Sequence, residues 1–442
     1  MKKIASICLF LIAFTVVAVL ILNTGGNSRT MYLLNWGEYI NQDLVKKFEE
    51  EHNCIVVEET VASSETMYQK ILSNTTSYDV AIPGDYMITK LKNEGLLNPI
   101  DIDNPKYPNL VDNGMFVDSL ENLRAKYGFT NEYSMPYFWG AYSILYNTRF
   151  TDTEQVIKDN GFKALFDRSL YQENVKLGMY STARWTVSAY MMSIGENPNN
   201  ENINLESVVS GIKKASFDVW GDDQLKRQTA TGQLDAAFTQ LGDFFDGLWL
   251  SLEEGLDIND KGETGLEALS FNVNIPENTS AFFDGMVIPT TSKNYDLANE
   301  FINFMLEPEN AYENALAIGY CPTLQSVVDL YNEAAETGEL YFENEEDSSR
   351  NVTMKEFLDK YPVYLNPLVN SNIDKVTMFE PKDSNYMTLC ETIVNQAKSN
   401  VVANNNAGTV LCITFFSVVG VSCISYTAYR ISKKKRKKYV SK

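Results

Sequence analysis

The sequence predicts an α/β fold with parallel strands, because strand-like and helix-like segments alternate from residue 31 onward. Residues 31–36, 54–58 and 78–82 are short apolar runs typical of buried strands, and each precedes a stretch with helical periodicity. Strands that alternate with helices of this length pair in parallel within one sheet. Such sheets bind ligands at the carboxyl ends of their strands.

The helices that follow these three strands have recognisable ends. The first helix is expected to begin at Asn41 and to end near His52, with its apolar residues on one face. The second and third are predicted over residues 63–73 and 85–94, and Gly95 follows the third, where glycine commonly ends a helix.

The rest of the body continues this alternation less regularly. Apolar runs predict further strands, one of which would cross the molecule near its middle, and amphipathic stretches predict further helices. The expected strands cover residues 141–146, 176–180 and 282–289, and the expected helices cover residues 184–194, 205–215 and 297–305.

Both ends of the chain carry uncharged, apolar stretches that are separate from this body. Residues 4–22 follow Lys2 and Lys3, and they predict either a cleaved signal peptide or an uncleaved signal anchor. Residues 408–429 precede a basic block over residues 433–438, which predicts a C-terminal transmembrane helix with a cytoplasmic tail. The body between them would lie on the extracytoplasmic side of the cell membrane.

The composition is strongly acidic, and this narrows the possible functions. The 442 residues include 37 Lys and Arg against 58 Asp and Glu, giving a net charge of −21, and they include one histidine, His52. Nucleic-acid binding is disfavoured because it depends on clustered basic residues. Zinc sites with several histidines are excluded. The acidic body is expected to attract cations.

The cysteines outside the apolar ends indicate neither a disulfide framework nor a metal site. Cys54, Cys321 and Cys390 are far apart in the sequence, and no CxxC spacing occurs. We expect structural thiols and no cofactor.

Acidic and aromatic residues occur together at two strand-to-helix turns. Trp36, Glu38 and Tyr39 follow the first strand, and Asp85 and Tyr86 follow the third. Aromatic faces attract cations and carboxylates accept charge-assisted hydrogen bonds, so this combination suits an ammonium group. For Asp85, a helix N-cap is an equally good interpretation.

Several short motifs give the sequence a family resemblance that covers about residues 31–400. The sequence resembles the extracytoplasmic spermidine/putrescine-binding proteins of ABC polyamine importers. The motifs are Asn35-Trp36-Gly37-Glu38-Tyr39, Glu65-Thr66-Met67-Tyr68, Tyr78-Asp79-Val80 with Pro83 and Tyr86, residues 133–140 (YSMPYFWG), residues 284–289 (DGMVIP), and Ile318-Gly319-Tyr320 with Pro322.

The resemblance implies a two-lobe fold of the periplasmic-binding-protein type II, with a cleft that closes on its ligand by a hinge motion. It implies discontinuous lobes that cross near residues 139–142 and 283–287. The expected division is 1–28 for the signal or anchor, 29–140 for the first part of lobe 1, 141–284 for lobe 2, 285–406 for the return to lobe 1 with C-terminal helices across both lobes, 407–429 for the transmembrane helix and 430–442 for the tail.

The resemblance also implies roles for individual residues. Asp284 would hold an amine and is the strongest single candidate, Glu38 would be an outer acidic contact, and aromatic walls would come from Trp36, Tyr39, Tyr86 and Tyr320. The implied partners are a polyamine and the permease subunits of an ABC importer, with no nucleic acid. A monomer is expected.

Several family positions differ in this sequence. Gly37 replaces a threonine, Gly84 replaces a small hydroxyl residue, and Gln240 falls where a tryptophan lines the family cleft. Thr182 and Trp185 stand where the family carries acids. The sequence leaves open which acid binds the second amine, and the candidates are Asp85, Asp218 and Glu380.

Three other functions are weighed against this one. A receptor or sensor for another organic cation fits the same features. A hydrolase would have to use His52, which lacks a G-x-S-x-G motif and is expected at an exposed helix end, or paired carboxylates. Residues 257–262 begin like an EF-hand loop, but Lys261 and Ala268 occupy ligand positions.

Overall fold

The computed structural model describes residues 29–399 apart from 112–113, 150–151, 173, 223 and 256–261. The expected signal or anchor segment and the expected C-terminal transmembrane helix lie outside the described residues, as does most of the EF-hand-like loop. Within the described ranges, no helix is long and apolar enough to cross a membrane.

The first sheet is parallel, which confirms the prediction from the alternating pattern. Its strand order is β2-β1-β3, and both neighbours of β1 run parallel to it. The strands are β1 (Arg29–Trp36), β2 (Cys54–Val61) and β3 (Val80–Ala81), and the helices that follow them are α2 (Gln42–His52), α3 (Ser64–Ser73) and α4 (Asp85–Asn93).

Local side-chain contacts explain where these helices begin. The side chain of Asn41 accepts a hydrogen bond from the backbone N–H of Asp43, and that of Ser63 accepts one from Thr66. Both are N-caps, which satisfy donors that the first turn of a helix leaves free. The N-cap of α4 is Gly84. The predicted bounds of all three helices are therefore confirmed to within about one residue.

The second sheet is built around one long strand, β5 (Met135–Asn147), in which every residue is buried. Its order is β10-β5-β8-β6-β7, and β9 and β12 also pair with β5. Its other strands are β6 (Leu177–Tyr180), β7 (Val219–Gly221), β8 (Ala236–Gln240), β9 (Phe271–Asn274), β10 (Ala281–Met286) and β12 (Cys321–Pro322).

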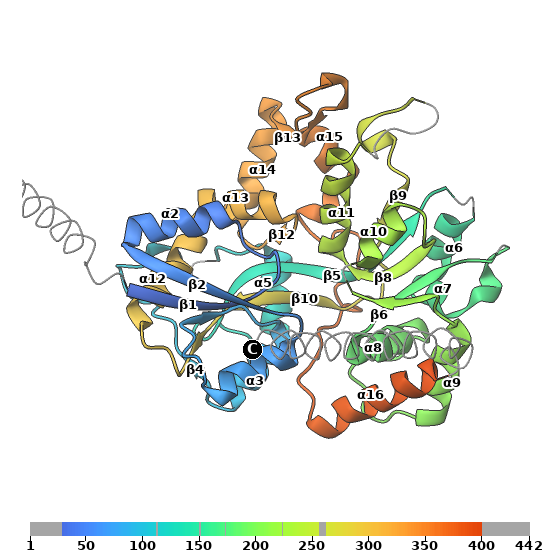
Figure 1. Cartoon of the computed structure of the whole chain (residues 1–442), viewed down its shortest axis with the longest axis horizontal. Helices are drawn as coiled ribbons and strands as arrows, with labels where there is room; N and C mark the ends of the chain where they lie inside the picture. The colour runs from blue at the N-terminus through green and yellow to red at the C-terminus, as the bar shows by residue number, and fades with distance from the viewer. Residues whose placement is uncertain are drawn as a thin grey trace, which may run out of the picture.

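The two halves of β5 have different partners, so this strand crosses the middle of the molecule as predicted (Figure 1). Its first half pairs with β10 and β12, and its second half pairs with β8 and β9. Trp139 is completely buried in the first half, and its indole N–H donates to the carbonyl of Pro322 over 3.0 Å. Trp139 is therefore a packing residue.

The segment predicted as one strand over residues 282–289 is divided. The register shifts between Asp284 and Gly285, after which β11 (Ile288–Pro289) pairs with β4 (Leu97–Asn98). Isolated bridges join Ala81 to Val287 and Gly84 to Asp284. The end of β10 is thereby held against the turn between β3 and α4.

The apolar side chains form two hydrophobic cores. The first core includes residues of β1 to β3, the first half of β5 and helices α2 to α5, α11, α12, α14 and α15. The second core includes residues of the later half of β5, of β6 and β8, and of helices α6 to α9 and α16. These and the remaining helices are α5 (Asp118–Lys126), α6 (Thr153–Asn160), α7 (Lys163–Phe166), α8 (Ala183–Ser193), α9 (Leu205–Ala215), α10 (Gln224–Ala230), α11 (Leu241–Glu253), α12 (Tyr295–Met305), α13 (Pro308–Ile318), α14 (Gln325–Thr337), α15 (Met354–Lys360) and α16 (Ser384–Lys398).

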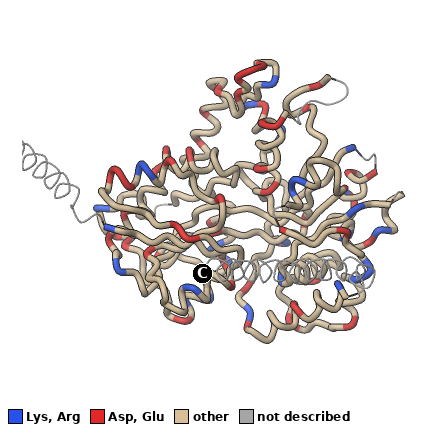
Figure 2. The backbone as a smooth tube through the Cα atoms, viewed as in Figure 1, with Lys and Arg blue, Asp and Glu red and all other residues tan. Residues whose placement is uncertain are grey.

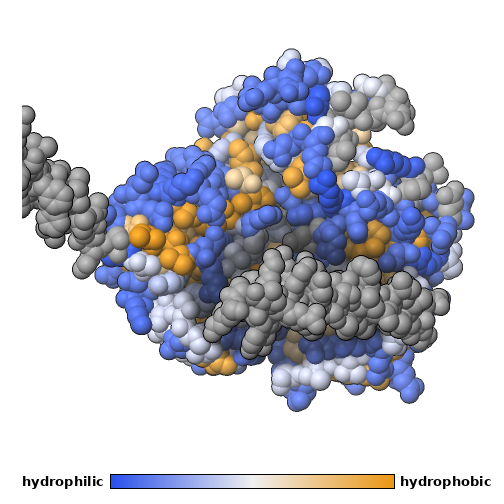
Figure 3. Space-filling model, in the orientation of Figure 1, coloured by the Kyte–Doolittle hydropathy of each residue, from blue (hydrophilic) through white to orange (hydrophobic). Residues whose placement is uncertain are grey.

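Two surface features stand out from this body. The hairpin of β13 (Leu340–Phe342) and β14 (Val352–Thr353) projects with α14 and α15, and its tip is rich in acidic residues (Figures 1 and 2). The outer face of β1 and β2 exposes the apolar side chains of Tyr32, Ile55 and Val57, and an apolar patch is visible over these strands in Figure 3.

His52 lies at the end of α2, as predicted, but it is less exposed than expected. Its side chain is 27% exposed, its ring stacks on Phe48, and its Nδ1 lies 3.3 Å from a carboxylate oxygen of Glu300. Helix α2 packs its last turn against α12, which partly covers the ring. Cys54, Cys321 and Cys390 are buried free thiols.

Candidate functional site

A cavity of about 680 Å³ lies between the two hydrophobic cores. Tyr86 and Tyr320 contact both cores, which places these two side chains at the boundary. The cavity is lined by Trp36, Gly37, Glu38, Tyr39, Thr60, Val61, Ala62, Ser64, Gly84, Asp85, Tyr86, Tyr142, Tyr180, Thr182, Trp185, Asp222, Gln240, Asp243, Phe282, Asp284 and Tyr320.

The cavity lies at the carboxyl ends of parallel strands from both sheets, as expected for α/β sheets. Lining residues follow β1, β2 and β3 of the first sheet and β6 and β7 of the second, with Gln240 at the end of β8. The site residues predicted from the sequence, which range along the chain from Trp36 to Tyr320, all line this one cavity.

All charged side chains that line the cavity among the described residues are acidic. Five carboxyl groups contribute to the lining, and among the described residues no Lys, Arg or His lines the cavity. Eight aromatic side chains share the same walls. An acidic, aromatic cavity without basic groups attracts an organic cation and repels an anion. The acids are Glu38, Asp85, Asp222, Asp243 and Asp284.

Asp284 is positioned by β10 and by a tyrosine that follows β1. The hydroxyl of Tyr39 donates a hydrogen bond of 2.6 Å to Oδ2 of Asp284. Desolvation inside the cavity raises the pKa of Asp284 to about 7, and the bond from Tyr39 opposes this rise. A Cβ atom on Gly84 would lie only 3.2 Å from Oδ1 of Asp284. The turn before α4 can approach Asp284 this closely because glycine has no side chain.

Asp85 is the first residue of α4 and is only 2% exposed. Its Oδ1 accepts a hydrogen bond of 2.6 Å from the backbone N–H of Tyr86. Its Oδ2 is buried and accepts no hydrogen bond from the described residues. Burial and the nearby charge of Asp284 raise its pKa well above the usual value, against backbone N–H groups that lower it. The N-cap is Gly84, so the interpretation of Asp85 as the helix cap is wrong.

The aromatic walls are fixed by their own contacts. The indole N–H of Trp36 donates to the carbonyl of Ile82 over 2.8 Å. The rings of Tyr39 and Tyr320 meet edge to face with centroids 5.0 Å apart. The hydroxyl of Tyr86 donates to Glu65 over 3.3 Å. Rings held in this way offer a preformed surface to a ligand.

Glu38 lies at the exposed rim of the cavity, which agrees geometrically with an outer contact. Its φ of +53° is in the left-handed region, which is uncommon for a residue other than glycine. This backbone conformation turns the chain from β1 toward α2. The neighbouring Gly37 faces open space, because a Cβ atom added there would have no other atom within 4 Å.

The structure corrects two of the three candidates for a second acid. Asp218 pairs with Arg168 at 2.6 Å and accepts the backbone N–H of Leu177, away from the cavity. Glu380 lies beside a neighbouring cavity, 3.7 Å from Lys382. Position in the sequence gave no information on where these carboxylates point.

Five acidic or aromatic lining residues were missed by the sequence reasoning. Asp222 directly follows β7, and Tyr180 is the last residue of β6. The rule that ligands bind at the carboxyl ends of strands would have indicated both residues. Asp243 carried no such signal: it lies in the first turn of α11 and accepts hydrogen bonds from the backbone of Gln240 and from Tyr180. Tyr142 and Phe282 are on the crossing strands β5 and β10.

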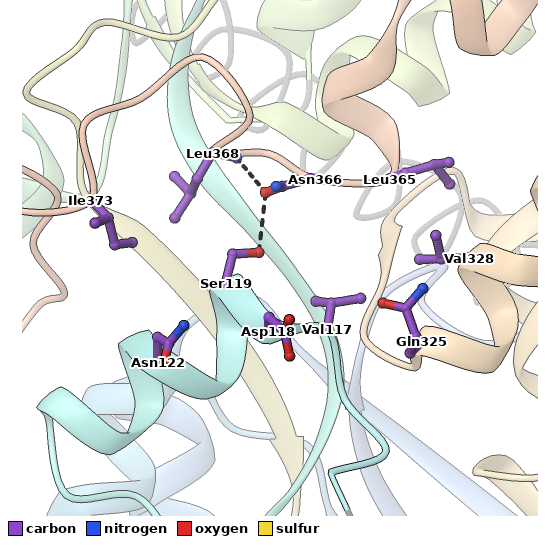
Figure 4. A pocket seen from close by; sticks show the side chains of 10 residues that line it. All are labelled: Val117, Asp118, Ser119, Asn122, Gln325, Val328, Leu365, Asn366, Leu368 and Ile373. Atoms are coloured by element: carbon purple, nitrogen blue, oxygen red, sulfur yellow. Dashed lines mark hydrogen bonds between the residues drawn. The ribbon is translucent and has the colours of Figure 1, made fainter.

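A second cavity, of about 440 Å³, lies where α5 and α14 begin (Figure 4). Its wall includes Ser119, whose hydroxyl donates to Asn366 over 3.2 Å. No aromatic side chain lines it within the described residues, and its single charged group is Asp118. It lacks the chemistry of the cavity between the two cores.

Comparisons with known proteins match this chain to extracellular and periplasmic binding proteins. A family model described as bacterial extracellular solute-binding protein matches residues 43–340. The spermidine/putrescine-binding periplasmic protein 1 of Haemophilus influenzae is 27% identical over 303 residues, covering 67% of this chain and 76% of that protein. The spermidine/putrescine-binding periplasmic protein of Salmonella typhimurium is 27% identical over 319 residues, covering 71% and 83%.

A solved structure agrees with these sequence matches. The spermidine/putrescine ABC transporter substrate-binding protein of Streptococcus pneumoniae superimposes with a TM-score of 0.60 and 27% identity. The match covers 84% of this chain and 99% of that structure. It confirms the expected periplasmic-binding-protein-like α/β architecture.

Proposed function

The chain belongs to the bacterial extracellular solute-binding protein family, and from this premise we propose that it captures a polyamine, putrescine or spermidine, and delivers it to an ABC importer. The observation that carries the proposal is the cavity lining, which has five carboxyl groups, eight aromatic side chains and no basic group among the described residues. The relatives named for spermidine and putrescine binding support the same ligand class.

In this proposal Asp284 accepts hydrogen bonds from one ammonium end of the ligand. The methylene groups lie against Trp36, Tyr86 and Tyr320, where burial of apolar surface and cation–π attraction both favour binding. Glu38 contacts the ligand from the rim. The ligand is bound and released without a reaction, so the protein is not an enzyme and uses no cofactor.

The proposed partners and location follow from the family and from the ends of the chain. The permease subunits of an ABC importer would receive the ligand, and the binding body would act as a monomer on the extracytoplasmic side. Tethering at residues 4–22, 408–429 or both would hold the body near the permease at a high effective concentration.

The two hydrophobic cores support a division into two lobes that close on the ligand. The proposed lobes are residues 29–140 with 285–406 and residues 141–284, with α16 packing onto the second lobe against α8 and α9. The crossing strands β5 and β10 would act as the hinge.

Ligand binding is tested most directly by thermal unfolding of the purified chain with putrescine, with spermidine and with a neutral sugar as control. A ligand at 100 times its Kd adds about 2.7 kcal/mol to the free energy of unfolding, so a clear rise in Tm is expected with an amine. The sugar should leave Tm unchanged. A rise with the sugar and none with either amine would contradict the proposal.

Two glycines of the cavity wall form a matched pair of test positions. Gly84→Ala is expected to weaken amine binding several-fold, because the new methyl group would lie 3.2 Å from Oδ1 of Asp284 and displace it. Gly37→Ala should bind as the unchanged protein does, since its Cβ would meet no atom within 4 Å. Isothermal titration calorimetry with putrescine measures both, and equal affinities would contradict the proposed contact with Asp284.

A receptor for a different organic cation is the second candidate, and one observation favours it. The cavity wall contains Thr182 and Trp185, the residues that replace family acids, and the indole N–H of Trp185 is buried without a hydrogen-bond partner among the described residues. A ligand with a hydrogen-bond acceptor near Trp185 would satisfy this group. A ligand screen that includes amino acids and guanidinium compounds separates this candidate from a polyamine carrier.

A further inference from the structure

Two carboxyl groups of the cavity are close to each other, and their negative charge is poorly compensated by positive groups. Asp85 is on the first turn of α4 and Asp284 is on β10, and the bridge between Gly84 and Asp284 holds these two segments together. Among the described residues no basic side chain lines the cavity. Asp85 is buried and Asp284 is half-buried, and two neighbouring carboxylates in such a place are costly, because desolvation and mutual repulsion both disfavour the second charge.

Glu38 is exposed at the rim, and hydrogen bonds separate Asp85 from the three remaining lining acids. Asp284 accepts a bond from Tyr39, and Asp222 accepts one of 2.5 Å from the hydroxyl of Ser181. Asp243 accepts bonds from Gln240 and Tyr180. Asp85 uses Oδ1 for the backbone of its own helix, and the backbone N–H of Phe283 also acts on its carboxyl group. Its buried Oδ2 makes no hydrogen bond of good geometry in the described part of the chain. An oxygen in this position is suited to carry a proton until a cation arrives.

We propose that Asp85 holds a proton in the empty cavity beside ionised Asp284, and that an incoming ammonium group displaces this proton to solvent. The O–H bond of the Asp85 carboxyl group breaks, the proton passes to water or buffer, and no covalent bond to the ligand forms. The cavity then binds one ammonium group between two carboxylates. This inference rests on the proposed function, since it assumes an amine ligand.

The groups around Asp85 allow this exchange. Tyr86 of α4, Tyr142 of β5 and Tyr127 after α5 have pKa values raised by burial, so they stay neutral at physiological pH. Arg184 of α8 is the cation that acts on Asp85, and it lowers the pKa of Asp85 less than burial raises it. The guanidinium of Arg184 donates to Asn199 over 2.9 Å, and its Cζ lies 5.2 Å from the ring centroid of Phe379 and 4.7 Å from that of Tyr386.

The expected consequence is that affinity increases with pH. Protons and the ammonium group compete for Asp85, so each displaced proton lowers the affinity about tenfold per pH unit on the acidic side of the relevant pKa. At pH 8 Asp284 is mostly ionised, because its pKa is about 7, and the Asp85→Asn variant identifies the source of the released proton. Below pH 7, Asp284 adds to the competition. The ligand amines stay protonated over this range, because alkyl ammonium groups have pKa values of about 10.

The test is isothermal titration calorimetry of the full chain with putrescine and spermidine at pH 8, in buffers with different enthalpies of ionisation. The slope of the binding enthalpy against the buffer enthalpy gives the number of protons released. We expect close to one for the unchanged protein and close to zero for Asp85→Asn, which keeps the hydrogen bond from Tyr86. Asp118→Asn removes one exposed carboxylate outside this cavity and is expected to keep the release.

The other possible outcomes distinguish failure of this inference from failure of the proposed function. Amine binding without proton release at pH 8 overturns the inference and leaves the proposed function intact. Full release from Asp85→Asn, or lost release from Asp118→Asn, also overturns it. If neither amine binds at any pH, the proposed function fails and the inference fails with it. Thermal unfolding of each variant checks that it is folded.

Discussion

Asp284→Asn is expected to weaken polyamine binding at least about thirtyfold. Removing one partner of a desolvated charge pair costs about 2 kcal/mol or more, because the ammonium group is left in the cavity without its carboxylate. Asparagine keeps the shape of the side chain and can still accept the hydrogen bond from Tyr39, so the cavity wall should persist. Calorimetric titration with putrescine at pH 8 measures the loss.

The same substitution is expected to stabilise the ligand-free protein above pH 7. The pKa of Asp284 in the folded protein, about 7, exceeds the usual 3.8, so the folded state binds more protons between these values. The contribution of Asp284 to stability therefore falls as pH rises from about 4 to 7 and is most unfavourable above pH 7. The largest loss of stability that this shift can cause is about 4 kcal/mol, because the pKa of Asp284 differs by roughly three units between the folded and unfolded states.

Chemical denaturation of the ligand-free protein at pH 5 and pH 8 measures this effect. The difference between Asp284→Asn and the unchanged protein should be larger at pH 8. Weaker binding together with lower stability at pH 8 would indicate that the variant damages the fold, and it would contradict the role assigned to Asp284. Unchanged affinity would remove Asp284 from the binding site.

Gly242→Ala is expected to lower amine affinity about five- to thirtyfold by moving Tyr320. Gly242 lies in the first turn of α11, directly beneath this ring, and a Cβ there would come within 2.2 Å of it. The ring must therefore shift from its place against Tyr39. Loss of an aromatic wall costs about 1 to 2 kcal/mol of cation–π and apolar contact.

Gly247→Ala, in the same helix, is the matched control. Its Cβ would be 3.8 Å from the nearest atom, on Phe271, which is an ordinary contact. Alanine has a higher helix propensity than glycine, so this variant should bind normally and be slightly more stable. Calorimetric titration of both variants with spermidine decides the role of Tyr320, and equal affinities would show that this ring is not part of the binding surface.

The sequence alone determined most of the secondary structure and the character of the site. Helix starts at Asn41 and Ser63 depend on a side chain that bonds to the backbone a few residues away, and the strands depend on short apolar runs. Both signals are local, so they can be read without the fold. Trp36, Glu38 and Tyr39 were found for the same reason, because they directly follow a strand.

Only the tertiary structure decided which distant groups meet. Tyr39 and Asp284 are 245 positions apart, and their hydrogen bond exists because β10 pairs with β5 beside the turn before α4. Asp218 was a candidate by charge, but packing directs it to Arg168. The isolation of Oδ2 in Asp85 likewise depends on what other elements leave unbonded around it. Side-chain surroundings are set by long-range packing, and sequence periodicity does not encode them.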